Sequence, residues 1–252
     1  GVRVAVVEMM PEILGAMDKE TSAMLRADYT KPGVNFYLNT KVIEVGKAGV
    51  TVERDGKTTV LEADKILVSV GRKANIGQVG LDKLNIELHR SGVKVNEHMQ
   101  TSHPHVYACG HSMLAHTAIR ESEVAINHIL GVEDKMNYDY IPGVVYTNPE
   151  LAGVGKTEEE LIAGGVSYQV QKLPMVYSGR FIAENELGNG LCKLILDEDE
   201  HIIGCHLLGN PASELIVVAG IAIEHGYTVE EFKKSVFPHP TVGEIFHETL
   251  FA

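Results

Sequence analysis

Cysteine, long apolar runs and positive charge are all scarce in this sequence. Three cysteines occur in 252 residues and none forms a CxxC pair, which excludes a disulfide framework and predicts a reducing compartment. The longest apolar run, LIVVAGIAI, has nine residues, whereas crossing a bilayer takes roughly 20. Lys and Arg together number 22 against 34 for Asp and Glu, giving a net charge of −12. We therefore expect neither a membrane nor, because phosphate binding requires clustered cations, a nucleic acid as a partner.

Complete nucleotide-binding and metal-binding signatures are also absent. No GxGxxG occurs, so the chain carries no complete dinucleotide-binding fingerprint. The segment GVGKT imitates the end of a phosphate loop, but Glu150 stands where that motif has glycine, and its carboxylate would repel phosphate. Five of the twelve histidines lie between residues 98 and 116 at spacings that fit no metal-binding pattern. Surface or loop histidines are therefore favoured over a metal site.

The remaining composition is that of a globular protein. Hydrophobic residues make up 44% and charged residues 22% of the chain, and its length suits one large or two small domains. Residue 1 is glycine and leads directly into the strand-like VRVAVVE. We therefore expect a piece of a longer polypeptide, and we recognise no signal peptide in it.

The first 71 residues show the pattern of a nucleotide-binding α/β unit. VRVAVVE at residues 2–8 is a continuous apolar run typical of a buried parallel strand, and residues 18–28 predict a helix with Asp18 near its cap. Four β-branched segments follow, and the pair Asp55-Gly56 predicts a hairpin between the last two. KILVSVG at residues 65–71 predicts another buried strand. The four segments are VNFYL, KVIEV, VTVER and TTVLE.

The pattern changes after residue 71. VYACG at residues 106–110 predicts a short buried strand, and residues 115–130 predict an amphipathic helix. From about residue 139, GVVYTNPELAGVG predicts two strands, and Thr157 begins a helix with a capping box to Glu160. CKLILDEDEHIIGCHLL predicts a hairpin around its acidic turn.

A strongly apolar helix follows this hairpin. Asn210 is the expected N-cap, Pro211 suits the first helical position, and Gly226 ends the helix. Eight of the nine residues at 215–223 are apolar, so nearly every face must be buried. We expect this helix to pack between a sheet and a second subunit. Thr228 and Glu231 then form another capping box.

Cys192 and Cys205 flank the acidic turn almost symmetrically. A tight hairpin would place them opposite each other, a few ångströms apart at Cβ. They lie in strands without the charged neighbours that activate sulfur, so we expect two packed thiols.

The segment FPHPTVGEIFHE near the end of the chain supports two interpretations. In the first, Thr241 is an N-cap and Glu244 completes a capping box, which leaves His239 unexplained. In the second, His239 is an acid/base and Glu244 orients its ring. The spacing alone favours the first.

Seven motifs in order carry a resemblance over essentially the whole chain: VAVVE, MDKETSAMLRADYTKPGVNFYLNTKV, VSVGRKAN, VYACG, MLAH, YTNPELAGVGKTEEEL and HPTVGE. The chain resembles the carboxy-terminal half of the dihydrolipoyl dehydrogenases, which are flavin-dependent pyridine nucleotide-disulfide oxidoreductases. The resemblance implies a mixed α/β and α+β fold in three parts. Residues 1–71 would be a partial, Rossmann-like NAD-binding domain without its first strand and GxGxxG. Residues 72–138 would be part of an FAD-binding domain, and residues 139–252 an interface or dimerisation domain.

The resemblance also implies an active site. His239 corresponds to the acid/base for the thiols, working in the partner subunit's active site, and Glu244 holds its ring. The bond between His239 and Pro240 is expected to be cis, as in relatives. The homodimer would form through residues 139–252 with the apolar helix at Leu215 at its centre.

The cofactor contacts implied by the resemblance lie elsewhere in the chain. Glu8 resembles the acid that hydrogen-bonds the adenosine ribose of NAD, and Val42 and Gly71 fall where the family contacts NAD. The MLAH segment would lie at a helix start beside the flavin of FAD, where backbone N–H groups favour negative charge on a reduced flavin. Its residues are Met113, Leu114, Ala115 and His116.

Three departures from the family pattern separate two hypotheses about function. The redox pair Cys-x4-Cys is absent, His111 stands where the family has an Asp that bonds the flavin ribitol, and the loop from there to Met113 is shorter. The first hypothesis is a portion of an FAD-dependent dehydrogenase that oxidises dihydrolipoamide with NAD. Its partner would be the lipoyl group of a 2-oxoacid dehydrogenase complex, in the cytoplasm or, in a eukaryote, the mitochondrial matrix. The second is a catalytically inactive dimerisation module, which is favoured for the chain alone. Metal binding by the histidines is a third, weaker alternative.

Overall fold

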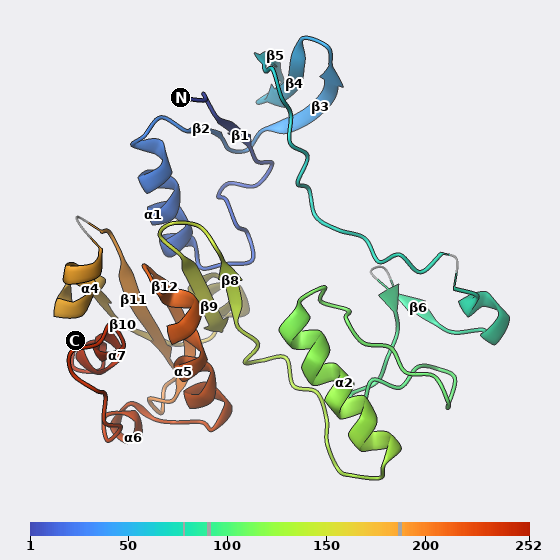
Figure 1. The fold of residues 1–252 in the computed structure, drawn as a ribbon, viewed down its shortest axis with the longest axis vertical. Coiled ribbons are helices and arrows are strands. Elements are labelled where there is room, and N and C mark those ends of the chain that lie inside the picture. The colour runs from blue at the N-terminus through green and yellow to red at the C-terminus, as the bar shows by residue number, and fades with distance from the viewer. Residues whose placement is uncertain (78, 90–91, 186–187) are drawn as a thin grey trace. The chain divides into compact units, whose positions relative to one another are not determined.

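The computed structural model describes residues 1–77, 79–89, 92–185 and 188–252 and forms two compact units (Figure 1). The large unit contains Gly1–Ile66 and Asp139–Ala252, and the small unit is Leu67–Tyr138. The mixed helix-and-strand architecture confirms the predicted fold class. The two units are defined by contacts between residues and not by bound ligands. The assignment of an NAD-binding domain to residues 1–71, an FAD-binding segment to 72–138 and an interface domain to 139–252 therefore stays a prediction.

The large unit begins with a parallel strand pair joined by a helix. β1 (Ala5–Val7) pairs with β2 (Asn35–Tyr37), and α1 (Lys19–Thr30) connects them. Asp18 caps α1, because its carboxylate accepts the Thr21 N–H at 3.0 Å. The strand and the capped helix were predicted from the sequence, but β1 is shorter than expected and only half-buried.

A three-stranded antiparallel sheet follows, formed by β3 (Lys41–Gly46), β4 (Gly49–Arg54) and β5 (Lys57–Glu62). Asp55 and Gly56 link β4 to β5 with φ angles of 49° and 72°. Two positive φ angles are what a type I′ turn requires, so the predicted hairpin is confirmed.

Two of the predicted strands do not form. Residues 65–71 have no strand partner, and Leu67 and Val70 are 91% and 89% exposed. Residues 106–110 make only an isolated bridge from Tyr107 to Gln100. An apolar run of this kind is stable as a strand only when neighbouring strands satisfy its backbone and other elements cover its faces. The described chain supplies neither to residues 65–71.

The small unit is built around one long helix, α2 (Ala115–Ile129), where the sequence predicted it. A 3-10 turn, η1 (Leu81–Leu84), and two short paired strands, β6 (Leu88–His89) and β7 (Gly92–Val93), precede it. The face of α2 that packs inside the unit carries four buried residues, which are Thr117, Glu121, Val124 and Ala125.

The second part of the large unit is a five-stranded antiparallel sheet with the order β10-β11-β12-β9-β8. Its strands confirm the predicted pair in residues 143–155 and the predicted hairpin around the acidic turn. Their bounds are β8 (Gly143–Val145), β9 (Leu151–Gly155), β10 (Gln169–Pro174), β11 (Leu191–Leu196) and β12 (Ile202–Leu208).

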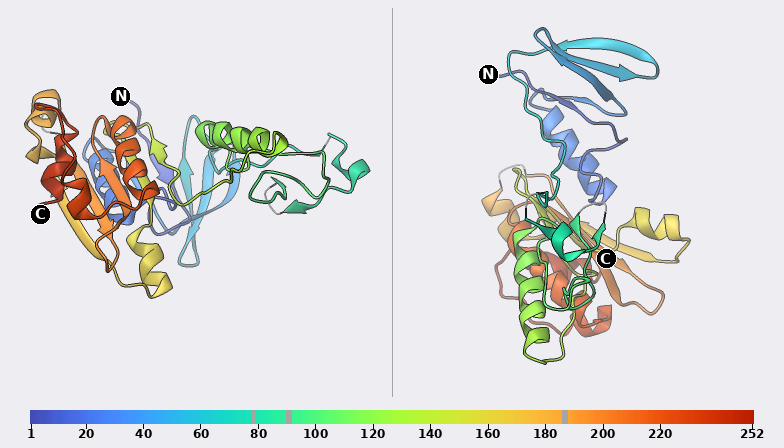
Figure 2. Two further views of the ribbon diagram at one scale, coloured as in Figure 1. Left: turned by 90° about the horizontal axis from the view of Figure 1, so that it is seen from below. Right: turned by 90° about the vertical axis from the view of Figure 1, so that its right-hand side faces the viewer.

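Helices cover both faces of this sheet (Figures 1 and 2). On one face, α5 (Ala212–Glu224) and α7 (Glu244–Thr249) pack on alternate strand residues such as Leu194 and Leu207. On the other face, α1 packs on Leu151 and Leu208. The remaining elements are α3 (Glu158–Gly164), η2 (Met175–Tyr177), α4 (Gly179–Glu184) and α6 (Val229–Phe232).

The predicted capping boxes of α3 and α6, Thr157 with Glu160 and Thr228 with Glu231, are both present. The prediction for the start of α5 is wrong. This helix begins at Ala212 with Pro211 in the cap position, so Asn210 lies outside it. The Asn210 amide instead donates to Asn148 Oδ1 and accepts the Glu150 N–H, which joins the two loops.

One side of α5 is buried against the sheet, as expected, and the second subunit expected on its other side stays a prediction. Ile216 and Ala219 lie in the core, but Val217 and Ile221 are 53% and 49% exposed. One apolar stripe of the helix is therefore uncovered within a single chain. Gly226 ends the helix as predicted, with φ of 62°.

Cys192 and Cys205 are free, fully buried thiols, as expected. They are not directly opposite, because Cys192 pairs with Leu207 and Cys205 with Leu194. They are diagonal neighbours on one face of the sheet, and burial together with the hydrogen bond to Cys192 raises the pKa of the Cys205 thiol.

Candidate active site

The loop before α7 brings together the histidine and glutamate that the sequence singled out. His239 Nδ1 lies 2.6 Å from Glu244 Oε1. The His239 side chain is 82% exposed, whereas that of Glu244 is 22% exposed. The peptide bond between His239 and Pro240 is cis, as predicted. With Nδ1–H donating to the carboxylate, the ring presents its Nε2 atom to the outside.

Glu244 also holds the backbone of this loop. Its second oxygen, Oε2, accepts the Thr241 N–H at 2.8 Å. This backbone hydrogen bond, followed by the one from His239, lowers the pKa of the Glu244 carboxyl. The same side chain thus fixes the loop with one oxygen and the imidazole with the other.

The capping-box interpretation of this segment is wrong for Thr241. α7 begins at Glu244 and its N-cap is Gly243. The Thr241 hydroxyl donates instead to the Pro238 carbonyl at 2.8 Å. Of the two hydrogen bonds of a capping box, only the one from the Thr241 N–H to the Glu244 carboxylate is present. The two interpretations of Glu244 are therefore compatible, because one oxygen bonds the backbone and the other bonds the imidazole.

An aromatic cluster anchors the loop two residues before His239. The half-buried Phe237 ring lies 5.9 Å from that of Phe232 and 6.4 Å from that of Phe246, measured between centroids. Sequence reasoning missed Phe237, although a large aromatic residue just before His-Pro is a usable signal for an anchored loop. The site is therefore an exposed imidazole on a well-anchored loop, with its Nε2 atom open to a group that exchanges a proton.

The candidate NAD contacts are distributed over the two units. Glu8 follows β1 at the carboxyl end of the parallel pair, where open α/β sheets bind ligands. One of its carboxylate oxygens accepts the Met10 N–H at 2.9 Å. Thr40 donates its N–H to the Glu8 carbonyl, and Val42, two residues on, is 44% exposed in β3. Gly71 belongs to the small unit and has φ of 98°.

The candidate FAD contacts surround the start of α2. Met113 has φ of 57°, and its carbonyl accepts a hydrogen bond from Arg72 at 2.6 Å. The structure thus joins the VSVGR and MLAH motifs directly. Leu114 is the N-cap and makes no side-chain capping bond.

These observations fit parts of each cofactor site. The start of α2 suits a group that carries negative charge, and Glu8 suits a ribose hydroxyl. His111 is exposed and offers no carboxylate to a ribityl hydroxyl. Its neighbour Gly110 donates its N–H to the buried carboxylate of Glu121, which also accepts the Tyr138 hydroxyl at 2.8 Å. The Glu121 carboxylate is thus engaged inside the small unit.

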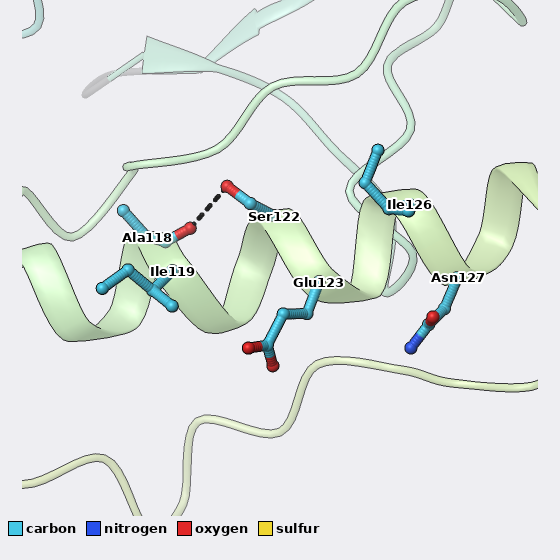
Figure 3. A pocket seen from close by; sticks show the side chains of 6 residues that line it. All are labelled: Ala118, Ile119, Ser122, Glu123, Ile126 and Asn127. Atoms are coloured by element: carbon cyan, nitrogen blue, oxygen red, sulfur yellow. Dashed lines mark hydrogen bonds between the residues drawn. The ribbon is translucent and has the colours of Figure 1, made fainter.

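Six side chains of α2, apolar and polar, line a surface pocket (Figure 3). Ile119 and Ile126 are 63% and 54% exposed, and between them the Ser122 hydroxyl donates to the Ala118 carbonyl at 2.7 Å. Together with Glu123 and Asn127 they line a shallow depression of the surface.

The described ranges contain neither a metal-binding cluster nor a membrane-spanning helix. Within residues 1–77, 79–89, 92–185 and 188–252, no three His, Cys, Asp or Glu side chains converge in a metal-binding arrangement. No helix in those same ranges has the length and apolar character needed to span a membrane.

The chain belongs to the pyridine nucleotide-disulfide oxidoreductases. Residues 1–128 match the family described as "Pyridine nucleotide-disulphide oxidoreductase", and residues 141–250 match its dimerisation domain. This is a family of FAD- and NAD(P)-dependent enzymes that form homodimers through that domain.

Similar proteins carry a more specific name. The chain is 38% identical to a mitochondrial dihydrolipoyl dehydrogenase of Caenorhabditis elegans and 35% identical to a dihydrolipoyl dehydrogenase of Cupriavidus necator. Both matches cover 100% of this chain but only 53% and 55% of the relatives. Among solved structures, LpdA from Mycobacterium tuberculosis superposes with a TM-score of 0.87 at 26% identity, covering 100% of this chain and 56% of that one. The chain thus spans about half the length of the relatives it matches.

Proposed function

We propose that this chain is the carboxy-terminal portion of an FAD-dependent dihydrolipoyl dehydrogenase, which converts dihydrolipoamide and NAD to lipoamide and NADH. The observation that carries the proposal is the 2.6 Å contact between His239 Nδ1 and Glu244 Oε1, with the ring otherwise exposed. The dihydrolipoyl dehydrogenase relatives support this reaction in particular. The compartment would be the cytoplasm or, in a eukaryote, the mitochondrial matrix.

In this proposal His239 works as an acid/base. Its Nε2 atom removes the proton from a substrate thiol, which leaves a thiolate and an imidazolium. Glu244 stabilises that imidazolium through the existing hydrogen bond and keeps the ring in the tautomer that leaves Nε2 free. A base positioned in this way contributes about 10²–10⁴-fold to the rate.

The cofactor roles in the proposal are limited to this chain's own residues. Glu8 would bind a ribose hydroxyl of NAD, with Val42 and Gly71 beside the nucleotide. The start of α2, at Met113 to His116, would face the flavin of FAD. Bound flavin and NAD supply the electron transfer that the side chains cannot perform.

The dimer surface in the proposal includes the exposed stripe of α5. Val217 and Ile221 are large apolar side chains about half exposed on a helix whose opposite side packs in the core. A second copy of residues 139–252 would cover them. The resulting dimer would bring His239 of one chain to the active site of the other, where the lipoyl group of a 2-oxoacid dehydrogenase complex would bind.

A second candidate is a catalytically inactive dimerisation module. It is favoured by two observations on this chain, the absence of a Cys-x4-Cys pair and the exposed His111 at the position of the family's aspartate. The module would keep the dimer surface and lose the redox chemistry.

Two measurements separate these candidates and test the dimer. A chimera that joins the amino-terminal half of the Cupriavidus necator relative to this chain is mixed with dihydrolipoamide, NAD and FAD, and NADH is followed by absorbance. NADH formation that disappears in His239→Gln supports the enzyme, whereas a flavin-loaded chimera that forms no NADH supports the inactive module. Sedimentation at micromolar concentration tests the dimer required by both, and a monomer would reject it.

A further inference from the structure

A buried serine on a different element contacts the loop that carries His239. Ser178 is 2% exposed and lies at the N-cap of α4, where its hydroxyl oxygen accepts the Phe181 N–H at 3.3 Å. The same hydroxyl donates to the carbonyl oxygen of Thr241 at 3.1 Å. This hydrogen bond joins residues 63 positions apart in the chain.

The Thr241 residue is thereby held on both sides. Its N–H donates to Glu244 Oε2 at 2.8 Å, and its carbonyl accepts from Ser178. The other oxygen of Glu244 holds the His239 ring. Because the ring is 82% exposed, the hydrogen bond to Glu244 is the restraint on its orientation, and that bond depends on the position of Glu244 relative to the loop.

We propose that Ser178 is a positioning residue for His239, acting through Thr241 and Glu244. This inference rests on the proposed acid/base role of His239 and adds to it a residue from outside the HPTVGE motif. Without the Ser178 hydroxyl, the Thr241 peptide loses one of its two anchors. The loop can then move away from Glu244, and the imidazole loses its fixed tautomer.

The test measures the tautomer directly, because it does not require the chain to be active. With ¹⁵N-labelled histidine, NMR distinguishes the neutral ring protonated at Nδ1 from the one protonated at Nε2. The wild-type His239 signal, assigned by its loss in His239→Gln, should show the Nδ1–H form. Ser178→Ala should shift the tautomer ratio on the order of fivefold towards the Nε2–H form, the effect of one lost hydrogen bond. Glu244→Gln should shift it at least as far.

Three further variants separate positioning from helix capping. Ser178→Gly removes the hydroxyl but keeps a residue that N-caps tolerate well, so it should shift the ratio like Ser178→Ala while remaining folded. Ser178→Thr keeps the hydroxyl and should retain the wild-type ratio. Thr157→Ala removes a comparable cap at α3 and should lower stability without moving the ratio.

A wild-type tautomer ratio in both Ser178→Ala and Ser178→Gly would overturn the proposal, as would an equal shift in Thr157→Ala. The outcome is independent of the activity measurement. A ratio that depends on Ser178 would retain the positioning role even if the flavin-loaded chimera formed no NADH, a result that would reject only the proposed enzyme.

Discussion

Replacing Lys193 with methionine should destabilise the large unit severely. The Lys193 side chain is 1% exposed in β11, and its Nζ lies 2.8 Å from Asp18 Oδ2 and 3.1 Å from Glu20 Oε2, with Glu158 as a third partner. Asp18 and Glu20 belong to the start of α1, and Glu158 begins α3. One lysine therefore fastens both helices to the same face of the five-stranded sheet.

The electrostatics of this cluster show why the cation matters. Burial alone would lower the pKa of Lys193, but the hydrogen bonds that it donates to Asp18 and Glu158 outweigh burial and raise the pKa above its ordinary value. Burial would likewise raise the pKa of Asp18, but its hydrogen bonds with Lys193 and the Thr21 N–H lower it. The two groups are thus ionised at neutral pH and compensate each other.

The magnitude follows from what Lys193→Met leaves behind. Asp18 is 0% exposed, whereas Glu20 and Glu158 are 36% and 26% exposed and can be solvated. Removing one partner of a buried ion pair costs about 3–5 kcal/mol, because the other charge stays buried without compensation. Asp18→Asn in the same chain removes that charge while keeping a good N-cap. The double variant should therefore recover part of the loss.

Urea unfolding followed by far-ultraviolet circular dichroism measures this effect. Lys193→Met should lower the midpoint by on the order of 1–2 M at a typical slope. Lys172→Met is the matched control, because Lys172 is the cross-strand neighbour of Lys193, also contacts Glu20, and is 46% exposed. An exposed pair contributes about 0–1 kcal/mol. Equal losses in the two variants, or no recovery in the double variant, would refute the reasoning.

Two further predictions concern the loop of His239 and the dimer surface. The pKa of Glu244 is lowered first by the hydrogen bond from the Thr241 N–H and then by that from His239. The ionised carboxylate therefore contributes to the stability of the fold above its unfolded pKa of about 4.3. That contribution is lost as the pH falls through the lower folded pKa. The Thr241 amide signal should accordingly titrate with a midpoint below 4.3 and lose that transition in Glu244→Gln; a midpoint at or above 4.3 would contradict this. Val217→Asp on α5 should weaken self-association at least tenfold in sedimentation. Ile162→Asp, at a residue that is 65% exposed on α3, should leave it unchanged, and equal effects would speak against the α5 surface.

Sequence reasoning succeeded where the determining interactions are local. The Asp55-Gly56 hairpin and the capping boxes beginning at Thr157 and Thr228 depend on residues at most three positions apart. Their chemistry can be recognised in any context. The pairing of His239 with Glu244 is also local in sequence. The spacing did not predict, however, that one Glu244 oxygen would bond the imidazole and the other the Thr241 N–H.

Sequence-based prediction failed where residues distant in the chain determine the local structure. Residues 65–71 have the composition of a buried strand, but a strand also needs partners, and none of the described segments pairs with them. Asn210 prefers to join the loop at Asn148 rather than to cap α5. The offset of Cys192 from Cys205 reflects the register of the hairpin, which shifts between Ile195 and Leu196. Ser178 could be recognised from sequence only as a cap, because its bond to Thr241 depends on the tertiary fold.

The central claim is that His239 is an acid/base held by Glu244. The most direct test is the rate of dihydrolipoamide oxidation, at fixed pH, by a chimera that joins the amino-terminal half of the Cupriavidus necator relative to this chain. If His239 is the acid/base held by Glu244, the chimera should form NADH, and His239→Gln should lower the rate by about 10²–10⁴-fold. His247→Gln, a partly exposed histidine on α7, should leave the rate near that of the chimera. A His239→Gln chimera that keeps the full rate would contradict the account.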